Sequence, residues 1–321
     1  MKNLIKKIIP YFDIFLVPFL FPAALLLKSI RKAGVQRLPF CKKTLFRVGV
    51  FPIRNHYYEP LFDMRKIKSS LHKERNLPGI NWRIQEQLEF IEKLKFANEL
   101  KNLPTERTGV LQYYLNNTEF KSGDAEFWYQ LIRLKKPRSI IEIGSGNSTL
   151  MAMNAIRKNK EENAEYFCNH ICIEPYEQPW LEKTGVTILR KKVEELETSF
   201  FSELGEDDIL FIDSSHIIKP EGDILFEYLE LLPGLNKGVI VHLHDIFSPR
   251  NYSSNWLISE VKFWNEQYLL EAFLSHNNSW KIIGSLNYLH HRHYEKLKSA
   301  CPFLTQDSNP GSFYIQKIDN E

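Results

Sequence analysis

Four apolar runs between residues 140 and 243 end in residues that could bind a ligand or do chemistry. The first run, residues 140–143, contains Glu142 and leads into a Gly-x-Gly turn at Gly144 and Gly146. Glycines let a backbone approach a ligand closely. A dinucleotide fingerprint would need a third glycine where the chain has Thr149, and the Gly-Lys-Ser/Thr of a phosphate-binding loop is also absent. The turn is predicted either to pack against another nucleotide-like cofactor or to be a tight turn without a ligand.

The second run, residues 170–173, ends at an acid. Glu174 could accept hydrogen bonds from both hydroxyls of a ribose, and a solvated loop acid is the alternative. It follows Gly146 by 28 residues, whereas ~20 is usual for a ribose-binding acid. A charged insert at residues 158–163 accounts for the difference. We favour the ribose role.

The third and fourth runs end in acids and histidines. The third leads into Asp213 and, three positions on, His216, while the fourth leads into His244 and Asp245. Polar residues at the end of an apolar strand cost free energy unless something uses them. We therefore predict that His216, His244 and Asp245 are catalytic, with one of the two histidines as general base. His242 shares a strand face with His244 and is interpreted as a core histidine.

These side chains need a sheet that brings them to one edge. A helix is predicted to begin near Asp124, whose acid suits the positive end of a helix. Short β-branched runs follow at residues 139–143, 170–173, 186–189, 209–212 and 239–243. Two further runs lie at residues 280–283 and 312–318. The alternation predicts a parallel α/β sheet with helices on both faces, which binds ligands at the carboxyl ends of its strands.

Five segments together resemble class I S-adenosylmethionine-dependent methyltransferases, and in particular the bacterial methyltransferase domain family 24. They are residues 122–126 (Ser-Gly-Asp-Ala-Glu), 142–146 (Glu-Ile-Gly-Ser-Gly), 211–216 (Phe-Ile-Asp-Ser-Ser-His), 242–247 (His-Leu-His-Asp-Ile-Phe) and 264–268 (Trp-Asn-Glu-Gln-Tyr). The block around residues 54–59 is similar to that family's N-terminal extension. The resemblance implies a Rossmann-like, seven-stranded methyltransferase sheet with helices on both faces.

The resemblance also implies a cofactor and a reaction. S-adenosyl-L-methionine would be held by Glu142, Gly144, Ser145, Gly146, Ser148, Glu174 and Asp213. The expected reaction is O-methylation of a sugar or another small hydroxylated acceptor in surface polysaccharide or glycoconjugate biosynthesis. A divalent metal would be held by Asp213, His244 and Asp245, at places similar to those in metal-dependent enzymes resembling catechol methyltransferase. His244 departs from their oxygen ligands and would admit manganese, iron or zinc, so metal dependence stays open.

Two other functions fit parts of the pattern. One is a nucleotide-sugar dehydrogenase or epimerase, against which the missing third glycine argues. The other is a non-catalytic, membrane-associated scaffold with a methyltransferase fold, against which the retained site residues argue. The net charge is only +3, so nucleic acid is not expected as a partner. An amino sugar as acceptor and a homo-oligomeric state are left open.

Composition divides the chain into three predicted parts. Residues 1–50 are apolar and basic, residues 51–118 form a helical and loop cap region, and residues 119–321 form the methyltransferase domain. A helix is expected over residues 82–100 of the cap region, where apolar residues keep helical spacing. The four cysteines fit no zinc pattern, and we expect them to be reduced thiols of a cytoplasmic protein.

The N-terminal part contains a fourteen-residue apolar run, residues 14–27, which includes Pro18 and Pro22. A membrane-spanning helix needs ~20 apolar residues, and prolines weaken a helix. Residues 1–30 are expected either to lie on the inner membrane face, where flanking lysines favour anionic lipid, or to pack on the protein's own core. The first alternative predicts a cytoplasmic protein that is peripheral to the inner face of the membrane.

Overall fold

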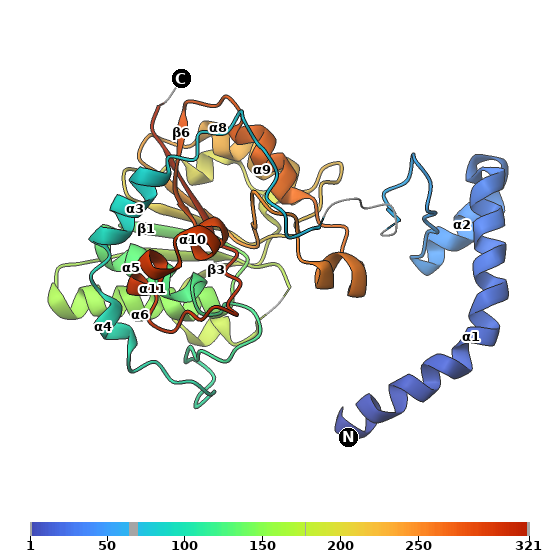
Figure 1. The fold of residues 1–321 in the computed structure, drawn as a ribbon, viewed down its shortest axis with the longest axis horizontal. Coiled ribbons are helices and arrows are strands. Elements are labelled where there is room, and N and C mark those ends of the chain that lie inside the picture. The colour runs from blue at the N-terminus through green and yellow to red at the C-terminus, as the bar shows by residue number, and fades with distance from the viewer. Residues whose placement is uncertain (1, 64–69, 177, 320–321) are drawn as a thin grey trace. The chain divides into compact units, whose positions relative to one another are not determined.

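The computed structural model describes residues 2–63, 70–176 and 178–319, and it divides into two compact units, Met1–Ser70 and Leu71–Glu321. The smaller unit holds the helices α1 (Lys2–Ala33) and α2 (Pro39–Val48), and the larger unit holds the sheet (Figure 1). Residues from Leu71 onward fold as part of the larger unit. The boundaries predicted near residues 50 and 118 stay predictions.

The larger unit alternates strands with helices. Its strands are β1 (Ser139–Ile143), β2 (Asn169–Ile173), β3 (Thr187–Leu189), β4 (Ile209–Ile212), β5 (Ile240–Leu243), β6 (Trp280–Ser285) and β7 (Phe313–Lys317). Its helices are α3 (Ile84–Lys93), α4 (Ala97–Leu100), α5 (Asp124–Lys135), α6 (Asn147–Glu162), α7 (Asp223–Phe226), α8 (Leu232–Gly234), α9 (Glu266–Leu274), α10 (Leu286–Arg292) and α11 (Tyr294–Ala300). Each strand agrees with its predicted run to within two residues at either end.

The strands form one sheet in the order β3-β2-β1-β4-β5-β7-β6. Strands β1 to β5 pair in parallel, and β7 pairs antiparallel with β5 and β6. The predicted seven-stranded α/β sheet is confirmed, with β7 antiparallel to its neighbours. The parallel register aligns the last residues of four neighbouring strands, Ile173, Ile143, Ile212 and Leu243. The residues that follow these four strands therefore meet at one edge.

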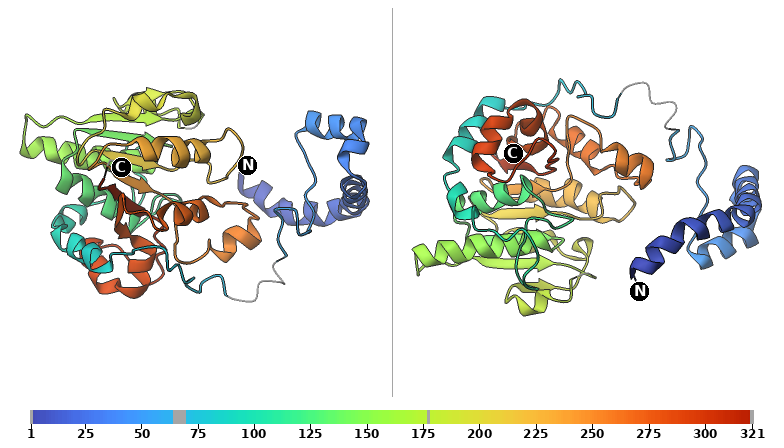
Figure 2. Two further views of the ribbon diagram at one scale, coloured as in Figure 1. Left: turned by 90° about the horizontal axis from the view of Figure 1, so that it is seen from above. Right: turned by 60° about the horizontal axis from the view of Figure 1, so that its bottom comes forward.

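Helices cover both faces of the sheet, as Figures 1 and 2 show. Along β1, Ile140 belongs to the apolar core beneath α5 and α6, while Ile141 and Ile143 belong to the opposite core. This alternation follows from the period of two in an extended strand. Each fully buried aliphatic side chain contributes about 1.5–3 kcal/mol, so the two cores hold the strand ends firmly in place.

The prediction of one continuous helix over residues 82–100 is wrong in its middle. Helix α3 ends at Lys93, where Leu94 takes extended backbone angles (φ −77°, ψ 98°), and α4 begins only at Ala97. The amide of Phe96 donates a hydrogen bond to the side chain of Gln130 on α5 (2.8 Å). A tertiary contact thus takes the amide that would otherwise continue the helix.

In the smaller unit, α1 is one helix that continues through Pro18 and Pro22. Residues Phe12–Ala33 are long and apolar enough to cross a membrane by length and composition, a longer segment than the fourteen-residue run suggested. Arg31 near its end binds Glu59 through two hydrogen bonds, at 2.8 and 2.9 Å. The chain between them, which contains α2, is therefore folded back toward the end of α1.

Candidate functional site

The glycine turn joins β1 to α6, and its two glycines have different roles. Gly144 has a φ of +81°, and a Cβ there would lie 2.1 Å from the carbonyl oxygen of Asp213 at the end of β4. Only glycine fits this close approach. Gly146 has a φ of 173°, which any residue adopts, and a Cβ there would meet nothing nearer than the Gln178 side chain at 3.9 Å. Its open side faces the cavity described below.

Glu142 lies beneath the turn and is fully buried. Its carboxylate accepts hydrogen bonds from the hydroxyls of Ser148 (2.7 Å) and Thr149 (3.2 Å), and it contacts Nε2 of His170. The Thr149 hydroxyl also accepts the Gly146 amide (3.2 Å). The residue that replaces the third glycine of a dinucleotide motif therefore ties the turn to Glu142.

Glu174 follows β2 and lies beside the glycine turn. Its carboxylate accepts hydrogen bonds from the backbone amides of Ser145 (3.3 Å) and Tyr176 (3.1 Å). It also lines a cavity of about 330 Å³ whose apolar walls include Ile143, Ile173 and Val193. An acid at a strand end beside an apolar pocket is a suitable acceptor for ribose hydroxyls.

A smaller cavity of about 180 Å³ lies over the glycine turn and adjoins the cavity of Glu174. Six of the seven residues predicted to hold a cofactor line it: Gly144, Ser145, Gly146, Ser148, Glu174 and Asp213. The seventh, Glu142, lies below the turn. Glu119, which precedes α5 and was not predicted, lines the smaller cavity as well.

A cluster of acids and histidines lies at the ends of β4 and β5. Nε2 of His216 is 3.3 Å from Asp213 and 3.8 Å from Asp245. Nδ1 of His244 is 3.5 Å from Asp213 and 3.6 Å from Asp245, and it has no hydrogen-bond partner although it is buried. On its other side, Nε2 of His244 is 3.9 Å from Asp124. The structure thus brings all of the predicted catalytic residues together.

The segment at residues 264–268 positions His216, a role that sequence reasoning missed. Glu266 at the start of α9 contacts Nδ1 of His216 at 2.6 Å, and the hydroxyl of Tyr228 donates to the same carboxylate at 2.9 Å. The ring of Trp264 lies 4.3 Å from the His216 ring, centroid to centroid. With Nδ1 bound, His216 presents Nε2 to Asp213 and Asp245.

Two residues of the cluster have unusual backbone angles. His216 has a φ of +59° and Asp245 a φ of +58°. Side chains other than glycine seldom adopt this left-handed region, and residues held there concentrate at functional sites. After Asp245, the amide of Ile246 donates to the carbonyl of Gly311 (2.7 Å), which fixes the turn against the segment before β7. The fold therefore holds both side chains in place at a cost in backbone energy.

The histidines and carboxylates of this cluster shift one another's pKa values. Burial alone would lower the pKa of His216, but hydrogen bonds with Asp213 and Glu266 outweigh it and raise the pKa to about 10. Burial also opposes the charged form of His244, yet Asp245 and Asp213 raise its pKa well above the usual range. Burial would raise the pKa of Asp213, but His244 and His216 hold it far below the usual range. Both imidazoles therefore carry the positive charge that the carboxylates attract.

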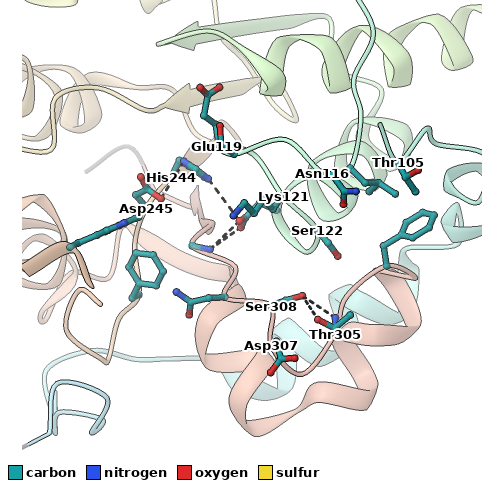
Figure 3. Close-up of a pocket in the computed structure, with 18 residues that line it drawn as sticks. Thr105, Asn116, Glu119, Lys121, Ser122, His244, Asp245, Thr305, Asp307 and Ser308 are labelled. Carbon is teal, nitrogen blue, oxygen red and sulfur yellow. Dashed lines mark hydrogen bonds and ion pairs between the residues drawn. The ribbon is translucent and has the colours of Figure 1, made fainter. Parts of the chain in front are cut away.

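A third cavity, of about 530 Å³, opens on the other side of His244 (Figure 3). Its polar lining side chains include Thr105, Asn116, Glu119, Lys121, Ser122, Thr305, Asp307, Ser308 and Asn309. Its aromatic lining side chains are Phe247, Trp256 and Phe303. His244 and Glu119 line this cavity and also the cavity over the glycine turn. The two cavities therefore adjoin at these two residues.

Residues of segment 122–126 fix the start of α5, which borders the third cavity. Asp124, at the start of α5, accepts hydrogen bonds from the backbone amides of Gly311 (3.0 Å) and Ser312 (2.7 Å). Glu126 accepts the hydroxyl of Ser122 (2.6 Å) and the amide of Gly123 (2.9 Å), which caps the helix. The predicted acidic start of the helix thus anchors α5 to the segment before β7.

His242 has the core position that the sequence indicates. It is fully buried, its Nε2 contacts the hydroxyl of Ser312 at 2.8 Å, and its ring stacks on Tyr314 at 4.1 Å. Burial and the neighbouring His244 hold the pKa of His242 well below the usual range. A neutral, packed imidazole of this kind supports the strand that carries His244.

The model of a methyltransferase domain family, family 24, matches residues 141–246. The match begins within β1 and runs through β5, including the glycine turn and the ends of β4 and β5, and it confirms the resemblance for this part of the chain. An uncharacterized protein of Archaeoglobus fulgidus is 28% identical over 173 residues, which are 50% of this chain and 76% of that protein. The part of the larger unit that forms the strand edge is therefore similar to a methyltransferase domain.

Two solved structures are similar at low sequence identity. An O-methyltransferase from Bacillus cereus in complex with S-adenosylhomocysteine (SAH) is 11% identical, with a TM-score of 0.36, over 74% of this chain and 98% of that chain. The N-terminal domain of EvdMO1, in the presence of SAH and D-fucose, is 12% identical, with a TM-score of 0.33, over 76% of this chain and 100% of that chain. The similarity to methyltransferases rests on the family model and not on these two structures.

Proposed function

We propose that this chain, whose residues 141–246 match methyltransferase domain family 24, is an S-adenosyl-L-methionine-dependent methyltransferase that acts on a hydroxyl of a sugar or another small polyhydroxylated acceptor. One observation carries the proposal. The cavity over the glycine turn and the polar cavity beyond it adjoin at His244 and Glu119. A methyl donor in the first cavity would face an acceptor in the second, as an in-line substitution requires.

The cofactor would extend along the strand ends. Its methionine part would pack over the turn at Gly144 and Gly146, where a Cβ on Gly146 would meet the side chain of Gln178 only at 3.9 Å. Its ribose would donate hydrogen bonds to Glu174, and its adenine would enter the cavity beside Ile173 and Val193. Glu142 would act indirectly, because its hydrogen bonds hold the turn that contacts the cofactor.

The reaction forms one bond to carbon and breaks another. The acceptor oxygen attacks the methyl carbon of the sulfonium, the carbon–sulfur bond breaks, and S-adenosylhomocysteine leaves with the electron pair. A hydroxyl is a poor nucleophile until it loses its proton. We assign the proton acceptor to Asp245, which lines the acceptor cavity and whose pKa is raised by burial. The charged His244, which lines both cavities, would stabilise the negative charge that develops on the acceptor oxygen.

The acid and histidine cluster also fits a divalent cation. Asp213, His216 and Asp245 each have one possible ligand atom within 4.8 Å of those of the other two. Glu266 fixes the His216 ring through Nδ1, the arrangement that orients metal-bound histidines in proteins. We therefore assign the ion to Asp213, His216 and Asp245, which replaces His244 of the sequence-based set by His216. When bound, the ion would lower the pKa of an acceptor hydroxyl.

The acceptor class is inferred from the lining of the third cavity. Hydroxyl, amide and carboxylate side chains surround it, and aromatic rings of Phe247, Trp256 and Phe303 add apolar faces. Polar groups that fix orientation beside aromatic surface are typical of small-molecule sites. A sugar offers both a ring of hydroxyls and an apolar face, so it suits this lining. Surface polysaccharide or glycoconjugate biosynthesis is the context that we propose for such an acceptor.

Calorimetric titration with S-adenosylmethionine and S-adenosylhomocysteine tests the cofactor site. We expect micromolar binding by the wild type and no binding by Gly146→Arg, whose side chain would fill the open space over the turn. Glu174→Ala should also lose affinity because the ribose loses its acceptor. If the folded wild type binds neither compound, with or without added manganese, the proposed function is wrong. Cofactor binding without turnover on any glycan would favour the scaffold alternative.

We also propose that residues 1–30 contact the inner face of a membrane, which would bring the enzyme to a membrane-associated acceptor. The support is the apolar segment Phe12–Ala33. Sedimentation of the whole chain with phospholipid vesicles, beside a variant lacking residues 1–30, tests the contact. Equal sedimentation of both proteins would remove this segment as the anchor.

A further inference from the structure

The smaller unit carries an unbalanced charge next to its apolar helix. No aspartate or glutamate lies between Asp13 and Glu59, yet the segment contains eight basic residues: Lys28, Arg31, Lys32, Arg37, Lys42, Lys43, Arg47 and Arg54. Glu59, the acid that ends the segment, is bound by Arg31 and Arg54. The other six cations are exposed in the structure. This charge therefore finds no counter-charge among the acids of its own segment.

Helix α2 mixes cations with exposed aromatic rings. Phe40 is 85% exposed and Phe46 is 59% exposed, with Lys42, Lys43 and Arg47 between and beside them. Exposing large apolar side chains to water costs free energy, and their entry into the boundary between headgroups and acyl chains is favourable. A helix that presents lysine, arginine and phenylalanine together is typical of a segment that lies in a membrane interface.

The fold holds α2 near the end of the apolar helix. Arg31 at the end of α1 binds Glu59 and lies over the ring of Phe51, 4.9 Å from its centroid. Phe51 in turn stacks on Phe46 of α2, with 5.6 Å between ring centroids. The basic residues are thus fixed where an inserted apolar helix would meet the headgroups, which is the position of segments that bind anionic lipid.

We infer that the basic segment 28–54, centred on α2, is a binding site for the headgroups of anionic phospholipids. The inference rests on the membrane contact proposed for residues 1–30 and extends it to a second element with a stated lipid chemistry. Nucleic acid shares the phosphate chemistry, but it offers no apolar layer for Phe40 and Phe46, so a bilayer is favoured. Residues 1–30 would attach the chain, and α2 would select the lipid.

Flotation of the whole chain on two kinds of vesicle tests the site. One vesicle is phosphatidylcholine alone, and the other contains phosphatidylglycerol at three parts in ten. Each surface cation contributes on the order of a fivefold gain on an anionic membrane. We expect the variant Lys42→Gln/Lys43→Gln/Arg47→Gln to lose roughly a hundredfold of its partitioning to the anionic vesicles and little on phosphatidylcholine. High salt should weaken the wild type in the same way.

The matched control removes the same charge elsewhere. Lys93→Gln/Lys95→Gln/Lys101→Gln changes three exposed lysines of the larger unit and should bind both vesicles as the wild type does. Equal flotation of the wild type on both vesicles would overturn the inference and leave the attachment by residues 1–30 intact. No flotation on either would also remove the proposed membrane contact, while cofactor titration would still test the methyltransferase. Tighter binding to an oligonucleotide than to the anionic vesicles would overturn the lipid assignment.

A second measurement does not depend on a variant. Acylation of lysines on the wild type, bound to each vesicle and followed by mass spectrometry, reports burial residue by residue. We expect Lys42 and Lys43 to react at least fivefold more slowly on the anionic vesicle, while Lys93 and Lys95 keep one rate on both. Equal rates for Lys42 and Lys43 on the two vesicles would contradict the site.

Discussion

The two halves of the strand edge satisfy their polar groups differently. At the ends of β1 and β2, Glu142 and Glu174 receive hydrogen bonds from hydroxyls, an imidazole and backbone amides. At the ends of β4 and β5, Asp213 and Asp245 are close to two imidazoles, and Nδ1 of His244 has no partner. Satisfied acids stabilise a fixed shape. The comparison therefore separates a half that holds its ligand from a half that handles charge and protons.

Asp245→Asn gives the largest effect that this comparison predicts. Asp245 lines the acceptor cavity and faces both histidines, so its loss should lower kcat/KM for methyl transfer roughly a thousandfold. Cofactor affinity by calorimetry should stay near the wild type. The control is Asp307→Asn, which removes an acid from another wall of the same cavity. Equal losses in both variants would erase the distinction between the two halves.

Two glycine variants test the half at the ends of β1 and β2, where the cofactor would bind. Gly144→Ala would place a methyl group 2.1 Å from a backbone oxygen at positive φ, so the turn must move, and cofactor affinity should fall roughly a hundredfold. Gly146→Ala meets no atom closer than 3.9 Å and should fold as the wild type does. Calorimetry and thermal unfolding measure both. Equal destabilisation of the two variants would show that the turn is not shaped by the contact with Asp213.

Glu174→Gln should have a smaller effect on cofactor affinity, at the end of β2. Ser145 and Tyr176 donate to different oxygens of Glu174, so the glutamine keeps an acceptor for only one of these two amides and also loses the charge. Cofactor affinity should therefore fall roughly tenfold. Turnover at saturating cofactor should change little. Glu161→Gln, an exposed acid on α6, serves as the control. A drop in turnover larger than the drop in affinity would move Glu174 from the holding half to the catalytic half.

His170→Gln should have the smallest effect, on stability. Burial alone would lower the pKa of His170, but hydrogen bonds with Cys172 and Glu142 raise it to about 10. A raised pKa means that the protonated imidazole stabilises the fold fully below about pH 6.5, and that this contribution is lost as the pH rises through about 10. The variant should therefore lose about 2 kcal/mol of unfolding free energy at pH 6 and less at pH 10.

Urea unfolding followed by tryptophan fluorescence measures that difference. All six tryptophans of the chain lie in the larger unit, so the signal reports this unit alone. A difference between wild type and variant that stays constant from pH 6 to pH 10 would mean that the contact between His170 and Glu142 is not an ion pair.

Local patterns in the sequence predicted the sheet and the residues at its edge. Strand positions follow from short β-branched runs, and the parallel order aligns the residues that follow β1, β2, β4 and β5. The glycine turn could be found because Gly-x-Gly after a strand is a local signal. The interruption after Lys93 could not, because it depends on a hydrogen bond between Phe96 and Gln130, which lie far apart in the chain.

The supporting contacts of the site were beyond sequence reasoning for the same reason. Glu266 reaches His216 across fifty residues, and Asp124 reaches the amides of Gly311 and Ser312 across more than 180. Both acids stand in segments that resemble the family, yet their chemistry depends on partners that no spacing reveals. Thr149 is the exception, because its position in a glycine motif was the signal that its role differed from that of glycine.

The contact between Gly144 and the carbonyl of Asp213 has a consequence for protein engineering. The turn of β1 fits only against a neighbouring strand whose backbone oxygen lies where a Cβ would otherwise be. A designer who transplants the turn into another sheet must transplant the end of β4 with it. The unit that can be exchanged between proteins is therefore the pair of strand ends. Sequence libraries that vary residue 144 would consist largely of misfolded chains whatever side chain stands at position 213, because the contact is with a backbone atom.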